Sequence, residues 1–189
     1  EGAWIIGGCC GTTPEHLAKT VQLCKGIAPL PMEKKNLTVI SSYTHAVQFG
    51  KRPLIIGERI NPTGKKRFQQ ALRDHDMDYI LKEGLTQQQN GAHILDVNVG
   101  LPEIDEVQLM QDAIKEIQSV IDLPLQIDTT DAVAMEQAMR IYNGKPLINS
   151  VNGKAHIMHE VFPLVKKYGG IVIAVAATFL YAKLKKLSY

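Results

Sequence analysis

From residue 54 to residue 175, short apolar runs alternate with stretches whose apolar residues recur every three or four positions. The runs are expected strands, and they open at Leu54, His93, Leu125, Leu147 and Ile171. The stretches between them have the spacing of helices that bury one face, and Pro163 is expected to bend the last of them. Their apolar stripes are Met77, Ile80, Leu81 and Leu85; Met110, Ile114, Ile117 and Ile121; Val133, Met135, Ala138 and Tyr142; and Ile157, Val161, Leu164, Val165 and Tyr168. Strands too apolar to have a face in water, separated by helices, indicate an α/β fold with a parallel sheet covered by helices.

Two architectures fit this alternation: an open doubly wound sheet and a closed (β/α)8 barrel. The alternation alone does not separate them. A complete barrel needs about 250 residues. Residues 54–189 number 136, so only about half of a barrel would be present.

The first 53 residues have a different character. A strand is expected at Ala3–Ile6, followed by a helix that Thr13 caps, Pro14 opens and Gly26 ends. Residues 27–53 contain three prolines and no sustained period, so they are interpreted as a linker.

Composition excludes several classes of protein. A net charge of +2 gives no reason to expect a nucleic-acid partner. Three cysteines are an odd number, which argues against a secreted disulfide framework and for a reducing, cytoplasmic location. Gly169–Tyr181 offers roughly 13 residues where a membrane-spanning helix needs about 20, so a buried strand running into an atypical tail is the better interpretation. Residues 1–10 have neither the basic region nor the cleavage site of a signal peptide.

Polar side chains stand where the expected strands end, which is where parallel α/β folds place their active sites. They are Glu58 and Arg59, Asp96 and Asn98, Asp128, and Asn149 and Asn152. Carboxylates and amides that converge on one edge can accept hydrogen bonds from a flat, donor-rich heterocycle, or can hold a hydrated magnesium ion. The alternative is that they cap the helices that follow, as Asp128 before Thr129–Asp131 could do. The position at the strand ends favours binding over capping.

Cys9 and Cys10 are adjacent, and neighbouring residues of a regular strand face opposite sides. Flanking glycines permit a backbone that turns both thiols toward one ion, and thiolates are preferred ligands of zinc. The alternative is a pair of small buried apolar side chains. Zinc needs three or four protein ligands. Cys24 lies a full helix away and His16 is expected on the helix surface, so a ligand is missing.

Five motifs carry a resemblance to known families. Gly7–His16 (GGCCGTTPEH) resembles the last strand and helix of the homocysteine S-methyltransferase barrel, and Ile56–Lys66 (IGERINPTGKK) resembles the opening of the pterin-binding methyltransferase barrel. Leu95–Gly100 (LDVNVG), Ile127–Thr130 (IDTT) and Ile148–Ser150 (INS) resemble the next three strand ends of that second barrel. Both barrels in this order are similar to the modular cobalamin-dependent methionine synthases.

The resemblance implies two partial TIM barrels. Residues 1–26 would be the last βα unit of a homocysteine- and zinc-binding barrel, 27–53 a linker, 54–175 the N-terminal half of a pterin-binding barrel, and 176–189 a tail that departs from the family. Cys9 and Cys10 would hold zinc together with an upstream cysteine. The pterin contacts would be Glu58, Asp128 and Asn149, with Asp96 and Asn98 at the same mouth.

The activity implied is transfer of a methyl group from 5-methyltetrahydrofolate via cobalamin to homocysteine, with cobalamin bound by a domain outside this chain. A chain with two incomplete sites would be inactive alone. Two alternatives stay open. One is a corrinoid-dependent methyltetrahydrofolate methyltransferase or a dihydropteroate synthase-like protein, which has no reason to carry the cysteine motif upstream. The other is a truncated, non-catalytic remnant.

Overall fold

A computed structural model describes residues 3–31 and 36–175. The chain divides into two compact units, Glu1–Asn36 and Leu37–Tyr189. The tail expected at 176–189 lies outside the described residues. Within the part of the chain that is described, no helix is long and apolar enough to cross a membrane.

Among its described residues, the N-terminal unit has one helix, α1 (Pro14–Cys24), as the sequence predicts. The side chain of Thr13 caps it, and the ring of His16 accepts from the backbone N–H of Thr13 at 3.2 Å, so His16 has a capping role that the sequence analysis missed. The strand expected at Ala3–Ile6 is wrong. A strand is stabilised by pairing with a neighbour, and this unit has no second strand among its described residues.

Residues 37–53, interpreted as part of a linker, contain a short antiparallel hairpin of β1 (Val39–Ser41) and β2 (Ala46–Gln48). Ile40 and Val47 face each other across it and are buried. Because each strand is only three residues long, it places a single apolar residue inward, and no period appears in the sequence. The segment therefore belongs structurally to the C-terminal unit.

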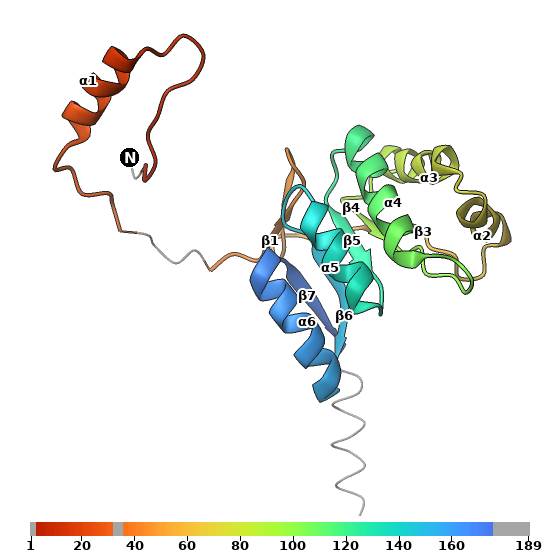
Figure 1. The fold of residues 1–189 in the computed structure, drawn as a ribbon. Coiled ribbons are helices and arrows are strands. Elements are labelled where there is room, and N and C mark those ends of the chain that lie inside the picture. Colours follow the sequence, from red (N-terminus) through yellow and green to blue (C-terminus); the bar gives the residue numbers. More distant parts are fainter. Residues whose placement is uncertain (1–2, 32–35, 176–189) are drawn as a thin grey trace, which may run out of the picture. The chain divides into compact units, whose positions relative to one another are not determined.

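Among its described residues, the C-terminal unit is built on a sheet of five parallel strands (Figure 1). Each strand opens within two residues of its predicted start. The strands are β3 (Ile56–Ile60), β4 (Ile94–Val97), β5 (Leu125–Asp128), β6 (Leu147–Asn152) and β7 (Ile171–Val175). They are ordered β3-β4-β5-β6-β7, the order of the chain. Successive right-handed crossovers in this order place every connecting helix on the same face of the sheet.

Helices fill each connection between strands. They are α2 (Lys66–Arg73), α3 (Met77–Gln89), α4 (Glu106–Val120), α5 (Ala132–Ile141) and α6 (Ala155–Tyr168). The last four were predicted. The eight-residue α2 was not, because it is strongly polar and buries only Phe68, Ala71 and Leu72. Pro163 lies inside α6 without ending it.

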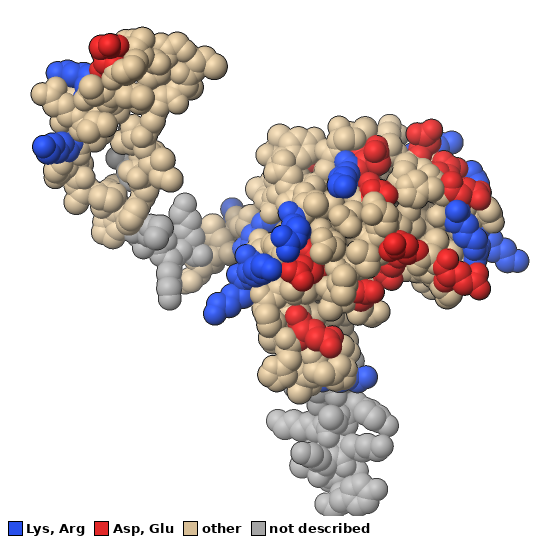
Figure 2. All heavy atoms as spheres, viewed as in Figure 1, with Lys and Arg blue, Asp and Glu red and all other residues tan. Residues whose placement is uncertain are grey.

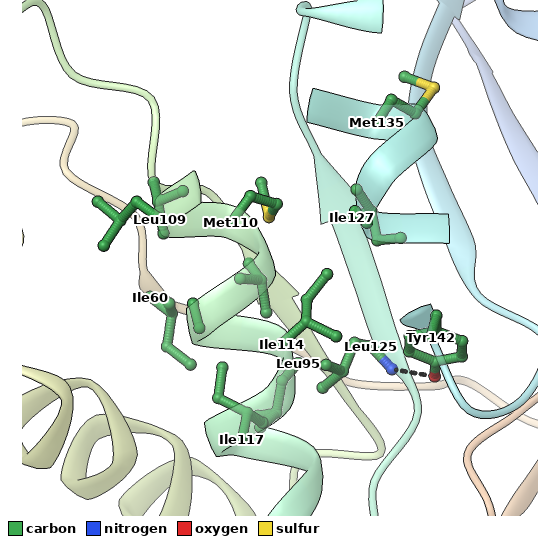
Figure 3. Packing of buried hydrophobic residues seen from close by; sticks show 14 of the residues in the cluster. Ile60, Leu95, Leu109, Met110, Ile114, Ile117, Leu125, Ile127, Met135 and Tyr142 are labelled. Atoms are coloured by element: carbon green, nitrogen blue, oxygen red, sulfur yellow. Dashed lines mark hydrogen bonds between the residues drawn. The ribbon is translucent and has the colours of Figure 1, made fainter. Parts of the chain in front are cut away.

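The main core lies between the sheet and these helices. Met110, Ile114 and Ile117 of α4 pack with strand residues such as Leu95 and Leu125 (Figure 3). The outer surfaces of the helices are polar: on the face drawn in Figure 2, acidic and basic side chains lie interspersed.

A smaller core lies on the other face of the sheet, near the N-terminal ends of the strands. Ile94 and Leu147 of the sheet join Ile40 and Val47 of the hairpin, with Ile56, Ile171 and Ile173 packed against them. The hairpin therefore packs on these apolar strand residues, the apolar floor. They lie on the inner face of the sheet, which is the face opposite the helices. Strand β7, expected to be buried, is half-buried and partly exposed, because β6 is its one neighbour in the described sheet.

Candidate functional site

The alternation of side chains along the strands collects polar groups on the inner face. In β5, Leu125 and Ile127 belong to the core under the helices, so Gln126 and Asp128 point to the opposite face. In β4, Leu95 and Val97 do the same and leave Asp96 on the inner face. Above the apolar floor, the inner face is therefore polar toward the carboxyl ends of the strands.

Asp96 is the most buried acid of this group, at 2 % exposure. The side-chain amide of Gln126, its partner in the strand register, donates a hydrogen bond to its carboxylate. Burial, followed by the charge of Asp128, raises the pKa of Asp96 to about 6; hydrogen bonds from Gln126 and Asn61 oppose the rise, and Glu58 adds to it. A carboxyl group with this pKa exchanges its proton close to neutral pH.

Asp128 lies beside it at the end of β5. Asn98 Nδ2 donates to Asp128 Oδ2 at 3.0 Å, and Asn98 Oδ1 accepts from the backbone N–H of Gly100 at 3.0 Å, which fixes the orientation of the amide. Burial raises the pKa of Asp128, the hydrogen bond from Asn98 opposes this, and the charge of Glu58 adds to it.

The other two predicted residues flank this pair. Asn149 of β6 is paired with Asp128 in the strand register and is half-buried, and its peptide bond to Ser150 is cis. Glu58 on β3 is exposed, close enough for its charge to act on Asp96 and Asp128. The structure therefore brings five predicted residues together at the carboxyl ends of the strands: Glu58, Asp96, Asn98, Asp128 and Asn149.

The capping alternative for Asp128 is wrong. The cap of α5 is Asp131, whose carboxylate accepts from the backbone N–H groups of Val133 at 2.7 Å and Ala134 at 3.0 Å. Asp105 plays the same part for α4. Asp96 and Asp128 are thus free of helix capping.

A hollow of about 410 Å³ adjoins Asp128 and Asn98. Glu106 and Thr129 line it and are hydrogen-bonded to each other through their side chains. Neither residue is among those predicted from the sequence, and neither are Gln126 and Asn61. For Gln126 a signal was present: it is a single amide inside the apolar run Leu125–Ile127.

Cys9 and Cys10 lie in the N-terminal unit and are exposed, with free thiols. They are the first two residues of a turn in which the Thr12 N–H donates to the Cys9 carbonyl at 3.0 Å. Among residues 3–31 and 36–175, no group of three or more His, Cys, Asp or Glu side chains is arranged to hold a metal ion. The described residues therefore supply two adjacent thiols and no third ligand beside them.

The arrangement at the strand ends suits a flat ligand with adjacent N–H donors. Two carboxylates and two amides accept, and the amides also donate. An acid with a raised pKa can donate as well when it is protonated.

Comparison with known proteins identifies the class. Residues 57–185 match the family of pterin binding enzymes, and the chain belongs to that family. Within it, the chain is similar to methionine synthase: it is 31 % identical over 186 residues to the protein of Mycobacterium leprae and 29 % identical over 180 residues to that of Mycobacterium tuberculosis. Each alignment covers 92 % of this chain and 15 % of the relative. The resemblance to methionine synthase inferred from the motifs is confirmed.

Proposed function

We propose that the inner-face cluster binds the pterin ring of 5-methyltetrahydrofolate as part of a methyltransferase that makes methionine from homocysteine. The observation that carries the proposal is the pair Asp96 and Asp128, held by Gln126 and Asn98 at the ends of parallel strands inside the region that matches pterin binding enzymes. The pterin ring presents neighbouring N–H donors, and a carboxylate can accept two of them at once.

The wider activity is proposed from the relatives. Methyl transfer would run from methyltetrahydrofolate to homocysteine, and cobalamin would supply a carrier of the methyl group from a partner domain. The chain spans about 15 % of the relatives' length. This supports the proposal that it is part of such an enzyme. We do not expect these residues to turn over substrate alone. The sheet, in chain order with helices on one face, is compatible with the first half of a (β/α)8 barrel from residue 54.

Zinc is proposed at Cys9 and Cys10, in a region that would end a homocysteine-binding barrel at residue 26. The exposed, adjacent thiols support this, because thiolates are preferred ligands of zinc. Zinc held there would lower the pKa of a bound substrate thiol. A further ligand has to come from outside the described residues. The cytoplasmic location expected from the cysteine count stays a prediction.

A corrinoid-dependent methyltransferase or a dihydropteroate synthase-like protein is the second candidate. Both alignments with methionine synthase cover 92 % of the chain and so reach well before residue 57, where the family match begins. This favours the first proposal. A non-catalytic remnant is the third candidate, and binding measurements test it directly.

The test is a titration of the 189-residue chain with 5-methyltetrahydrofolate, followed by NMR so that weak binding is detected. Signals of Asp96, Asn98, Asp128 and Asn149 should shift together, while those of the hairpin residues Ile40 and Val47 stay in place. A chain that remains folded and shows no shift at the cluster with excess folate would refute the proposal. Homocysteine, which lacks the ring, is the matched control ligand and should leave the cluster unchanged.

A further inference from the structure

Gln126 carries an amide at a buried position where an apolar side chain would be expected. It lies in the middle of β5, is only 3 % exposed, and its neighbours Leu125 and Ile127 are fully buried. It directly adjoins Leu147 of the apolar floor in the strand register. A buried polar side chain at such a place is costly unless its hydrogen bonds are made, so a purely structural role gives no reason for it.

The hydrogen bonds of Gln126 are made on one side only. Its Nε2 donates to Asp96, whereas its Oε1 is buried without a partner in the described structure. The reversed amide would point its carbonyl at the carboxylate, placing two acceptors against each other when Asp96 is ionised. The amide orientation therefore fits the charged form of Asp96 and leaves the carbonyl unsatisfied as a consequence.

The other groups that face Asp96 make this donor important. Asp128 from β5 and Glu58 from β3 are both acidic, and the side chain of Asn61, in the loop after β3, supplies one more hydrogen bond to Asp96. Among the described residues, the groups that most strongly affect the pKa of Asp96 include no Lys or Arg. The side-chain amides of Gln126 and Asn61 thus stabilise the charged form of Asp96, as a cation usually does beside a buried carboxylate.

We propose that Gln126 is a positioning residue, which holds Asp96 ionised and in a single orientation so that this carboxylate can accept the N–H donors of a bound pterin. The inference rests on the proposed function for its ligand. The link between Gln126 and Asp96 can be measured without any ligand.

The first measurement is the carboxyl titration of Asp96 by carbon NMR in the ligand-free, 189-residue chain. The variant Gln126→Met keeps the length of the side chain and removes the donor. The titration midpoint of Asp96 should rise by about one pH unit, because the hydrogen bond to the charged form is lost. An unchanged midpoint overturns the inference, whether or not folate binds.

The second measurement is affinity for 5-methyltetrahydrofolate as a function of pH. With its midpoint one unit higher, Gln126→Met should bind roughly fivefold more weakly than the parent at pH 6, and the difference should shrink toward pH 8.5. In an Asp96→Asn background, which cannot ionise, Gln126→Met should produce no pH-dependent change. A loss of affinity that is equal at every pH would show a packing defect and also overturn the inference.

Gln87 provides the matched control. It is a buried amide of α3, 7 % exposed, that accepts from the backbone N–H of Arg59 at 2.8 Å and donates to the backbone carbonyl of Glu83 at 3.1 Å. Gln87→Met should lower stability and leave the Asp96 midpoint in place. If Asp96 titrates as proposed in all variants and yet no folate binds, the proposed function fails and the role of Gln126 stands.

Discussion

The hydroxyl of Tyr142 donates a 3.0 Å hydrogen bond to the backbone carbonyl of Ser41, 101 residues earlier in the chain. The same hydroxyl accepts from the backbone N–H of Leu125 at 3.0 Å (Figure 3). Lys145 also connects to the hairpin: its backbone exchanges two 2.9 Å hydrogen bonds with the backbone of Ser41. One side chain thus connects the hairpin, the end of α5 and the start of β5. Burial raises the pKa of Tyr142 to about 12, so the hydroxyl keeps its proton at any ordinary pH.

Tyr142→Phe should therefore destabilise the C-terminal unit. The substitution leaves the buried N–H of Leu125 without its partner, which costs about 1–3 kcal/mol. Denaturant unfolding measures the loss. Tyr43→Phe, at an exposed position of the hairpin turn, is the control and should be neutral; equal midpoints for the two variants would contradict the structural role of the hydroxyl.

Asp128→Asn should weaken binding of 5-methyltetrahydrofolate by roughly tenfold or more, because a desolvated ring edge loses its charged acceptor. The free energy of unfolding should not fall, since burial already disfavours the charge on Asp128. Calorimetric affinity and thermal unfolding of the same variant test both halves of the prediction. A variant that melts early yet binds normally would remove Asp128 from the site.

Asp131→Ala is the matched control for that experiment. It removes the cap of α5, three residues further along the chain, and should cost about 1 kcal/mol of stability. Folate affinity should remain that of the parent.

Asp96→Asn should change how stability depends on pH. The pKa of Asp96 is about 6 in the folded chain against an ordinary value of 3.8, so between these values the folded state binds more protons than the unfolded state. Stability then falls as pH rises from about 4 to 6, by something on the order of 2 to 3 kcal/mol, and the full penalty persists above pH 6.

The Asn variant should lose most of this decline and be the more stable protein at pH 7, although it binds folate less well. Asp128 contributes in the same direction, so a smaller slope should remain. Urea unfolding at several pH values measures the slope, and the exposed Asp78→Asn should keep it. If Asp96→Asn and the parent lose stability in parallel, the carboxyl is not the group responsible.

Cys9→Ser and Cys10→Ser should each reduce zinc binding, which is expected to be weak in the 189-residue chain, because two thiolates leave the ion under-coordinated. Cobalt(II) absorption in the thiolate region, followed by competition with zinc, provides the readout. Cys24→Ser should retain full binding. Undiminished binding in both of the first two variants would refute their assignment as ligands.

The sequence predicts the central sheet well because its signal is strong: the four residues of a run such as Ile94–Val97 are all buried, whereas a strand with one face in water alternates apolar and polar residues. It fails for the hairpin, where each strand buries a single residue, Ile40 or Val47, whose partners Ile94 and Leu147 in the sheet lie roughly 50 to 100 positions further along the chain. It also fails at Ala3–Ile6, where an apolar run resembles a strand but has no described neighbour to pair with.

For the candidate site, the strand-end rule selects Asp96, Asn98, Asp128 and Asn149, which the register then brings together. The rule cannot select Gln126, which lies below the strand end, or Glu106, which reaches the site from the first turn of α4. Such residues become visible only when cross-strand register and loop paths are known.

The order β3-β4-β5-β6-β7 also has a consequence for folding. Strands that are adjacent in space are consecutive in the chain, so each pairing closes a short loop and costs little chain entropy. Docking of the hairpin onto Tyr142 and Lys145 closes a loop of about a hundred residues, and it gains stability only after α5 and β5 have formed. We therefore expect the amide proton of Ser41 to be protected later in refolding than those of Leu95 and Ile127.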